Sequence, residues 1–235
     1  MFALGIKTGM EKKFVDTVFS HTSELVFLRT FEDGSKCVVK LLEQNKQRQG
    51  QEYRIMKALC ERTTIRVPKV IKHSQIEFLH EGKLYSEMIV MDYIPGSPIG
   101  VDMCYSKEEA RSIALQAIDL VQAIHEAGFM HGDLRPQNFI WDGENLTLID
   151  FGRSYEIEFH HNVKRETFQP GHEHVKTLCV EVPHPAFIRD NWETHSTPTY
   201  EYKALSRCLK HIVGKDLYKE FGASFDKFRE EVLLL

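Results

Sequence analysis

The segment HGDLRPQNFIWDGENLTLIDFG, residues 131–152, constrains this chain more than any other part of its sequence. Three of its residues, Asp133, Asn138 and Asp150, supply two carboxylates and a carboxamide, and a short hydrophobic strand at 140–141 and 146–149 separates them. Such hard oxygen ligands are the groups that a phosphate-bound magnesium ion requires. The segment therefore raises the expectation of a magnesium and phosphate site.

The composition is that of a globular protein without an excess of basic residues. With 235 residues, 42% of them hydrophobic, the chain can form one large domain or two small lobes around a real core. The net charge of −4 and the pI near 6.3 argue against polyanions as main partners. We therefore expect no nucleic acid as the main partner and no membrane.

The cysteines and the N-terminus favour a location inside the cell. Five widely spaced cysteines, odd in number and without a CxxC, fit reduced thiols inside the cell. The N-terminal MFALGIKTGMEKKF has too short an apolar stretch for a signal peptide, and no later run reaches the roughly 20 apolar residues of a membrane span. We expect an intracellular, cytoplasmic protein.

The first half of the chain predicts a hairpin followed by a helix. Two β-rich runs within 24–42 flank an Asp-Gly turn, and Lys40 lies at the end of the second run. Apolar residues near helical spacing then predict a helix over 45–60 that carries Glu52, although Gly50 weakens its first half.

Proline and glycine divide the rest of the chain. A proline-broken segment at 67–79 precedes an apolar strand that runs into a Pro/Gly/Ser stretch near 95–98, which we interpret as a linker. Residues 106–128 predict the clearest helix, with a Ser-x-x-Glu capping box at its start and a glycine at its end. Its apolar stripe is expected to face a core: Ile113, Ala117, Leu120, Val121 and Ile124. The His- and Pro-rich stretch 154–198 has little periodicity, and 201–213 is helical again.

In order along the chain, the features are a strand lysine, a helix glutamate, a linker, a long helix, H-G-D-x-x-x-x-N and D-F-G. This order resembles the signature set of protein kinases. HGDLRPQN resembles their catalytic loop, IDFG their metal-binding motif and VVK their lysine motif, and the likeness covers about residues 13–152. The resemblance implies a two-lobed α+β fold, with a small β-rich N-lobe at 1–91, a hinge at 91–98 and a mainly helical C-lobe at 99–235.

The resemblance implies ATP and Mg²⁺ as cofactors. Asn138 and Asp150 would bind the magnesium ion. Lys40 would bind the inner phosphates of ATP, and Glu52 would orient Lys40 through an ion pair. Glu43 and, more remotely, Glu61 are rivals of Glu52 for that role.

The rest of the nucleotide would contact an apolar slot and a loop. Residues expected near the adenine lie on the linker, on the lysine strand and on the hairpin of the opening segment: Met91, Tyr93, Val39, Ile140 and Ile149. The loop ahead of the first hairpin, FSHTSELVF, lacks a GxGxxG pattern and offers hydroxyl groups for the phosphates instead: Ser20, Thr22 and Ser23.

Asp133 would accept the proton of the attacking hydroxyl, and Arg135 would either face the transferred phosphate or form a surface salt bridge. His131 is expected to be structural, with a hydrogen bond to backbone beneath the loop. The histidines of the 160–195 stretch match no known metal-ligand spacing, so a solvated loop is preferred there: His160, His161, His172 and His174.

Several departures from protein kinases leave the acceptor open. The loop FSHTSELVF, the hinge MDYIPGSP and Gly132 in place of arginine resemble aminoglycoside and choline kinases more closely. No APE motif follows IDFG, and the short remainder implies truncated substrate-binding subdomains. The interpretations are a kinase acting on a protein Ser/Thr, a small-molecule kinase, and a pseudokinase that binds nucleotide as a scaffold.

Overall fold

The computed structural model describes residues 13–20, 24–44, 50–100, 103–157 and 198–235. The chain forms two compact units, Met1–Tyr53 with Pro68–Ile94 and Arg54–Val67 with Pro95–Leu235. The first is rich in strands and the second is mainly helical, which confirms the α+β, two-lobed class expected from the sequence. The expected boundaries of the lobes and hinge stay a prediction.

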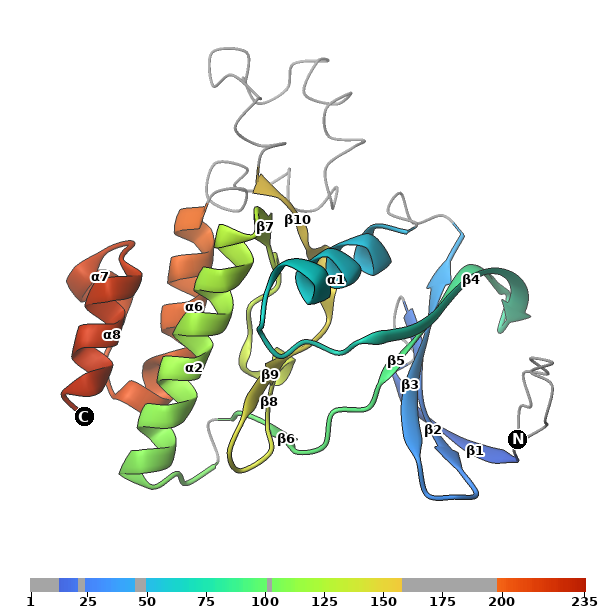
Figure 1. Ribbon diagram of the computed structural model, residues 1–235, viewed down its shortest axis with the longest axis horizontal. Coiled ribbons are helices and arrows are strands. Elements are labelled where there is room, and N and C mark those ends of the chain that lie inside the picture. Colours follow the sequence, from blue (N-terminus) through green and yellow to red (C-terminus); the bar gives the residue numbers. More distant parts are fainter. Residues whose placement is uncertain (1–12, 21–23, 45–49, 101–102, 158–197) are drawn as a thin grey trace, which may run out of the picture. The chain divides into compact units, whose positions relative to one another are not determined.

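The first unit is built on an antiparallel sheet, coloured blue to green in Figure 1. Its strands are β1 (Phe14–Ser20), β2 (Glu24–Phe31), β3 (Lys36–Glu43), β4 (Val70–His80) and β5 (Lys83–Asp92), in the order β1-β2-β3-β5-β4. The predicted hairpin is confirmed as β2 and β3, and Gly34 has a φ of +80° in its turn. Lys40 lies inside β3 rather than at its end.

One face of this sheet forms a hydrophobic core. The residues of β2 and β3 that contribute to it alternate along each strand, as the period of two requires. The buried members of the cluster are Leu25, Phe27, Cys37, Val39, Leu41, Tyr85 and Met88. Residues between them, such as Val26, Val38 and Lys40, therefore lie on the other face.

The sequence does not predict the two outer strands, β1 and β4. Both are edge strands, and some of their apolar side chains are exposed, such as Val15, Ile71 and Leu79, so apolar residues do not mark a buried face along these strands. A long-range contact supports β1, because Arg29 of β2 donates two hydrogen bonds to Asp16, at 2.8 and 2.7 Å. Pro68 in the proline-broken segment 67–79 precedes β4, and the rest of that segment from Val70 belongs to the strand.

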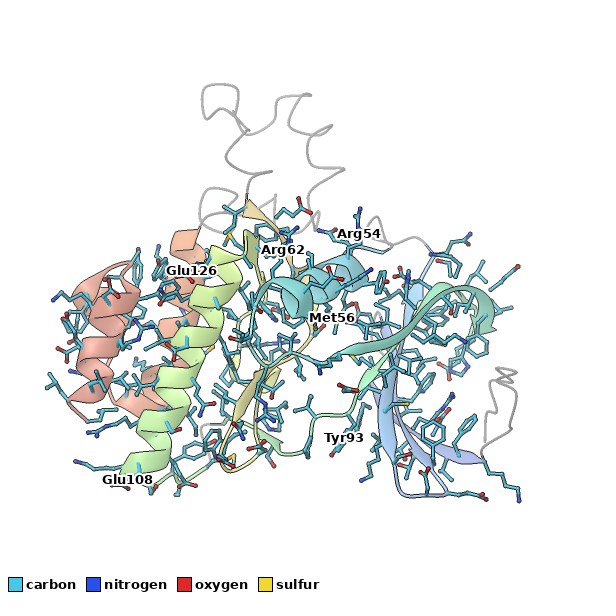
Figure 2. All side chains as sticks on the ribbon, in the orientation of Figure 1. Arg54, Met56, Arg62, Tyr93, Glu108 and Glu126 are labelled. Atoms are coloured by element: carbon cyan, nitrogen blue, oxygen red, sulfur yellow. The ribbon has the colours of Figure 1, made fainter. Side chains whose placement is uncertain are left out.

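Helix α1 (Gln51–Arg62) begins directly after Gly50, whose φ of +75° lies outside the helical region. Residues 45–49 lie outside the described part of the chain. Figure 2 labels three side chains of α1, namely Arg54, Met56 and Arg62. Glu52 lies in the first turn.

Helix α2 (Lys107–Glu126) is the long helix that the sequence predicts, and Figure 2 labels Glu108 and Glu126 near its two ends. Ser106 accepts the backbone N–H of Glu109 at 3.1 Å, and the Glu109 carboxylate accepts the N–H of Ser106 at 2.9 Å. This is the expected capping box. The predicted apolar stripe is buried, and Gly128, with a φ of +89°, follows the last turn.

Helices α6 (Pro198–Val213) and α8 (Phe225–Leu233) pack against α2. Helix α6 confirms the helix predicted at 201–213. The short α7 (Leu217–Phe221) joins them, with Asp216 as its N-cap. The sequence analysis did not predict α7 or α8. No helix in the described ranges is long and apolar enough to cross a membrane.

Short strands complete the second unit. Strands β6 (Ser97–Pro98), β8 (Phe139–Trp141) and β9 (Leu146–Leu148) form one sheet, and β7 (Phe129–Met130) pairs with β10 (Tyr155–Glu156). Single 3-10 turns at η1 (Pro136–Asn138) and η2 (Phe151–Arg153) stand before β8 and before β10. The β8–β9 hairpin confirms the hydrophobic strand predicted between Asn138 and Asp150.

Candidate active site

Lys40 is buried in the first unit and lies between two carboxylates. Its Nζ is 2.9 Å from Glu52 Oε1 and 2.7 Å from Glu24 Oε2. The ion pair predicted between Lys40 and Glu52 is therefore present. The two rivals of Glu52 for this role pair with other lysines. Glu43 Oε1 lies 3.9 Å from Lys83 Nζ, and Glu61 Oε1 lies 3.9 Å from Lys57 Nζ.

Sequence reasoning missed Glu24 as a second partner of Lys40. The register of the hairpin contained the signal, because Val26 lies directly opposite Lys40 and Glu24 stands two residues before it. Residues two apart on a strand share a face, so Glu24 lies on the lysine face of the sheet. Lys40 thus has two acidic neighbours where the sequence predicts one.

The lysine face also carries apolar residues. Val38 is two residues before Lys40, and Met91 lies directly opposite Val38 in the adjacent strand β5. Val38 is half-buried, whereas Met91 is buried. Val39 points into the hydrophobic core on the opposite face, so its predicted place beside a nucleotide is corrected, and Val38 is the residue that shares a face with Lys40.

Of the three other nucleotide contacts predicted in this part of the chain, the structure describes the side chain of Tyr93 alone. Tyr93 follows β5 and is half-buried, with the Lys36 ammonium 5.3 Å from its ring centroid. Ser23 lies outside the described residues, as does the side chain of Ser20. Their roles stay predictions.

In the second unit, hydrogen bonds connect the residues of the opening segment. The side-chain Nδ2 of Asn138 donates to the backbone carbonyl of Asp133 at 2.8 Å. The backbone carbonyl of Asn138 accepts the N–H of Ile149 at 2.9 Å, directly before Asp150. The structure therefore connects Asp133 and Asn138 directly and ties Asn138 to the residue preceding Asp150.

Asp150 has an unusual backbone conformation. Its φ of +64° makes it one of two non-glycine residues with positive φ in the described chain. Aspartate tolerates this region better than most residues, and such strained positions cluster at functional sites. The conformation supports a functional role for Asp150 and follows from no local sequence rule.

His131 is fully buried beneath the loop. Its Nε2 lies 3.0 Å from the carbonyl oxygen of Ile149, and its own carbonyl accepts the Ser154 hydroxyl at 3.0 Å. The ring packs edge-on against Phe151, with centroids 4.9 Å apart. His131 thus connects the HGD and DFG segments, which confirms the structural role expected for it.

Two arginines lie beside the carboxylate of Asp133. Arg135 Nη2 is 3.3 Å from Asp133 Oδ2, and Arg153 Nη1 is 3.5 Å from Asp133 Oδ1. Both guanidinium groups are about half exposed. Burial and the charge of Asp133 raise the pKa of nearby Tyr200. The sequence analysis assigned no site role to Arg153 or Tyr200.

Glu201 of helix α6 is a fully buried carboxylate that the sequence analysis also missed. Its Oε1 accepts the backbone N–H of Gly132 at 2.5 Å, and its Oε2 lies 2.8 Å from Nε2 of His125. Burial alone would raise the pKa of Glu201. The hydrogen bond and charge of His125, the charge of His131 and the Gly132 hydrogen bond together hold that pKa below its usual range.

The predicted apolar contacts of this unit lie on the hairpin. Ile140 is buried in β8, and Ile149 is half-buried after β9. The four histidines from His160 to His174 that sequence analysis considered as metal ligands lie outside the described residues. Whether Ile140 and Ile149 contact a nucleotide stays a prediction.

Comparison with known proteins identifies the family. The model of the protein kinase domain matches residues 22–175, which is more than half of the chain. This chain therefore belongs to the protein kinase domain family.

The curated relatives carry kinase names and cover part of the chain. It is 33% identical over 118 residues to serine/threonine-protein kinase 1 of African swine fever virus (isolate Pig/Kenya/KEN-50/1950), covering 48% of this chain and 36% of that protein. It is 36% identical over 96 residues to CBL-interacting serine/threonine-protein kinase 21 of Arabidopsis thaliana, covering 38% and 23%. It is 30% identical over 135 residues to CBL-interacting protein kinase 3 of Oryza sativa subsp. japonica, covering 54% and 29%. The chain thus matches about a third or less of the length of these relatives. The resemblance to aminoglycoside and choline kinases stays a prediction.

Proposed function

We propose that this chain is a phosphotransferase that uses ATP and Mg²⁺ to phosphorylate the hydroxyl of a protein serine or threonine. The observation that carries the proposal is the hydrogen-bonded loop of the second unit. There the Asn138 side chain positions the backbone of Asp133, and its carbonyl accepts the N–H next to Asp150. A loop connected in this way can keep a base and two metal ligands in register.

The donor set of the second unit fits a magnesium ion. The Asn138 amide nitrogen donates to Asp133, so the amide oxygen is the atom of this side chain that can bind a cation. Asp150 supplies a carboxylate in a strained backbone conformation. Bound magnesium would neutralise charge on the phosphate oxygens of ATP.

The first unit supplies the contacts that we assign to the nucleotide. Lys40 is held as a buried cation by Glu52 and Glu24, and a lysine in that setting can bind phosphate oxygens. Val38 and Met91 share its face of the sheet and offer apolar surface to the adenine ring. Val38 therefore takes the place of Val39 among the residues that we assign to the adenine ring, and the other nucleotide contacts predicted from the sequence are kept.

Asp133 is the residue that we assign as general base. Its carboxylate would accept the proton of the acceptor hydroxyl, while Arg135 and Arg153 orient it. The two arginines are exposed enough to contact a phosphoryl group as well. A protein serine or threonine is favoured as acceptor by the names of the viral and plant relatives. We also propose a cytoplasmic location, which the five widely spaced cysteines without a CxxC favour.

Transfer of labelled γ-phosphate from Mg-ATP to a panel of proteins and peptides tests this function. The Asp133→Asn variant should bind Mg-ATP nearly as well as wild type but turn over about 10² to 10⁴ times more slowly, the usual worth of a positioned general base. Asp142→Asn is the matched control, because Asp142 caps the β8–β9 turn, and its rate should be unchanged.

The outcomes separate the alternatives. Transfer to metabolites but to no protein would assign a small-molecule kinase. Mg-ATP binding without transfer to any acceptor would assign a pseudokinase. Loss of both binding and turnover in Asp133→Asn would make Asp133 a structural residue of the loop.

A further inference from the structure

Glu87 is a fully buried carboxylate in the middle of strand β5, and both of its oxygens have partners. Oε2 accepts the backbone N–H of Gly50 at 2.8 Å, and Oε1 lies 2.8 Å from Nε2 of His73 on strand β4. His73 in turn stacks on Tyr53, with ring centroids 4.1 Å apart and an interplanar angle of 13°. All four residues belong to the same compact unit.

These contacts meet at the start of helix α1. Gly50 is the residue before the helix, and Tyr53 lies in its first turn. Glu52, the partner of Lys40, stands between them in sequence. Two contacts with the sheet therefore fix the first turn, one at the Gly50 amide and one at the Tyr53 ring.

A buried carboxylate is a costly way to fill a strand position. Its charge must leave water, and an apolar side chain of similar volume would avoid that penalty. The hydrogen bonds of Glu87 offset the penalty only while Gly50 and His73 keep their positions. Glu87 is thus coupled to the location of the helix start.

We propose that Glu87 and His73 form a brace that positions the first turn of α1, so that Glu52 maintains its ion pair with Lys40. This inference rests on the proposed function, in which that ion pair orients the lysine toward the phosphates of ATP. Glu87 is then a positioning residue that acts through Glu52. Lys40 has Glu24 as a second partner, so without the brace the lysine stays paired while Glu52 moves away.

Two substitutions at the same position test the brace. Glu87→Met keeps the volume but removes both acceptors, and it should lower kcat/KM for Mg-ATP roughly tenfold to a hundredfold, the equivalent of a hydrogen bond to a charged group. Glu87→Gln retains an acceptor for the Gly50 amide and should recover most of the activity. Glu43→Gln is the matched control, because it alters a carboxylate of the same sheet that pairs with Lys83, and its kinetics should equal wild type.

A double-mutant cycle distinguishes positioning from general stability. If Glu87 acts through Glu52, Glu87→Met should change kcat/KM less than about twofold in a Glu52→Gln background. Fully multiplicative effects of the two substitutions would overturn the proposal. Should Glu87→Met fail to fold, His73→Phe takes its place, because it keeps a ring against Tyr53 and loses the bond to Glu87.

Hydrogen exchange provides a readout that does not need catalysis. Peptides covering 50–56 should exchange faster in Glu87→Met than in wild type, and Glu87→Gln should lie close to wild type. Unchanged exchange in Glu87→Met would refute the brace, even if the activity falls. An inactive wild-type protein would refute the proposed function, and the exchange comparison would still decide whether the brace exists.

Discussion

Gly132 donates its backbone N–H to the buried carboxylate of Glu201 over 2.5 Å and so connects the HGD segment to helix α6. Gly132 has a φ of +76°, and a β-carbon there would lie 2.2 Å from the carbonyl oxygen of Arg153. Only glycine fits that position. The glycine that stands where protein kinases carry arginine is therefore a requirement of this local fold.

Gly132→Ala should destabilise the protein by about 2–4 kcal/mol, because it combines left-handed backbone strain with a clash against backbone. Gly214→Ala is the matched control, since Gly214 has a φ of +78° and open space around its α-carbon. Gly214→Ala should lower the stability only by the left-handed backbone strain, about 1 kcal/mol. Urea denaturation measures both values. Equal losses in the two variants would show that the approach of Arg153 is unimportant.

Glu201→Gln should change how stability depends on pH. The pKa of Glu201 lies below its ordinary value of 4.5, so its stabilising contribution is present above that pH and is lost as the pH falls through the folded-state pKa. At pH 7 the variant should be less stable by about 1–3 kcal/mol, the worth of a buried hydrogen bond to a charged group.

The test for Glu201 is chemical denaturation from pH 7 down to the acid limit. The difference between wild type and Glu201→Gln should shrink below about pH 4.5, where the unfolded carboxylate takes up its proton. A difference that stays constant over the whole range would contradict the assignment of a charged Glu201.

Asp150→Asn should abolish phosphoryl transfer and weaken magnesium-dependent nucleotide binding, because a neutral amide balances less of the metal's charge. Thermal-shift titrations of ATP with and without Mg²⁺ measure the effect. ATP with Mg²⁺ should stabilise the wild-type protein more than ATP alone does, whereas adding Mg²⁺ should give the variant no further stability. A gain of equal size in both proteins would remove Asp150 from the metal site.

Activity should not depend on phosphorylation of the segment after DFG. Gly132 provides no charge to pair with a phosphate, and the two nearest hydroxyl residues, Ser154 and Tyr155, are buried. Ser154 also donates its hydroxyl hydrogen to the carbonyl of His131. Thr167, a third candidate, lies outside the described residues.

Protein made in bacteria and shown by mass spectrometry to lack phosphate should equal material from eukaryotic cells in rate. Phosphatase treatment of the eukaryotic material serves as the control. The prediction would be wrong if the protein from eukaryotic cells were much more active than the bacterial protein and phosphatase removed the difference.

Local sequence signals predicted the elements whose cause is local. The Asp-Gly turn specifies the β2–β3 hairpin, and the Ser106–Glu109 capping box specifies the start of α2. The outer strands β1 and β4 escaped prediction because their pairing, rather than their alternation, makes them strands. Helix α1 begins at Gln51, directly after Gly50, because Gly50 takes a backbone conformation that a helix does not contain.

By itself the sequence determined the family and the spacing of Lys40, Asp133, Asn138 and Asp150, because motif spacing is a property of the chain. Only the tertiary structure decided which side chains surround them. Glu201 stands 69 residues from Gly132 and Glu87 stands 37 from Gly50, and no sequence period relates such distant positions. Burial pairs these carboxylates with backbone amides, since a charge removed from water must find hydrogen-bond donors wherever the fold brings them.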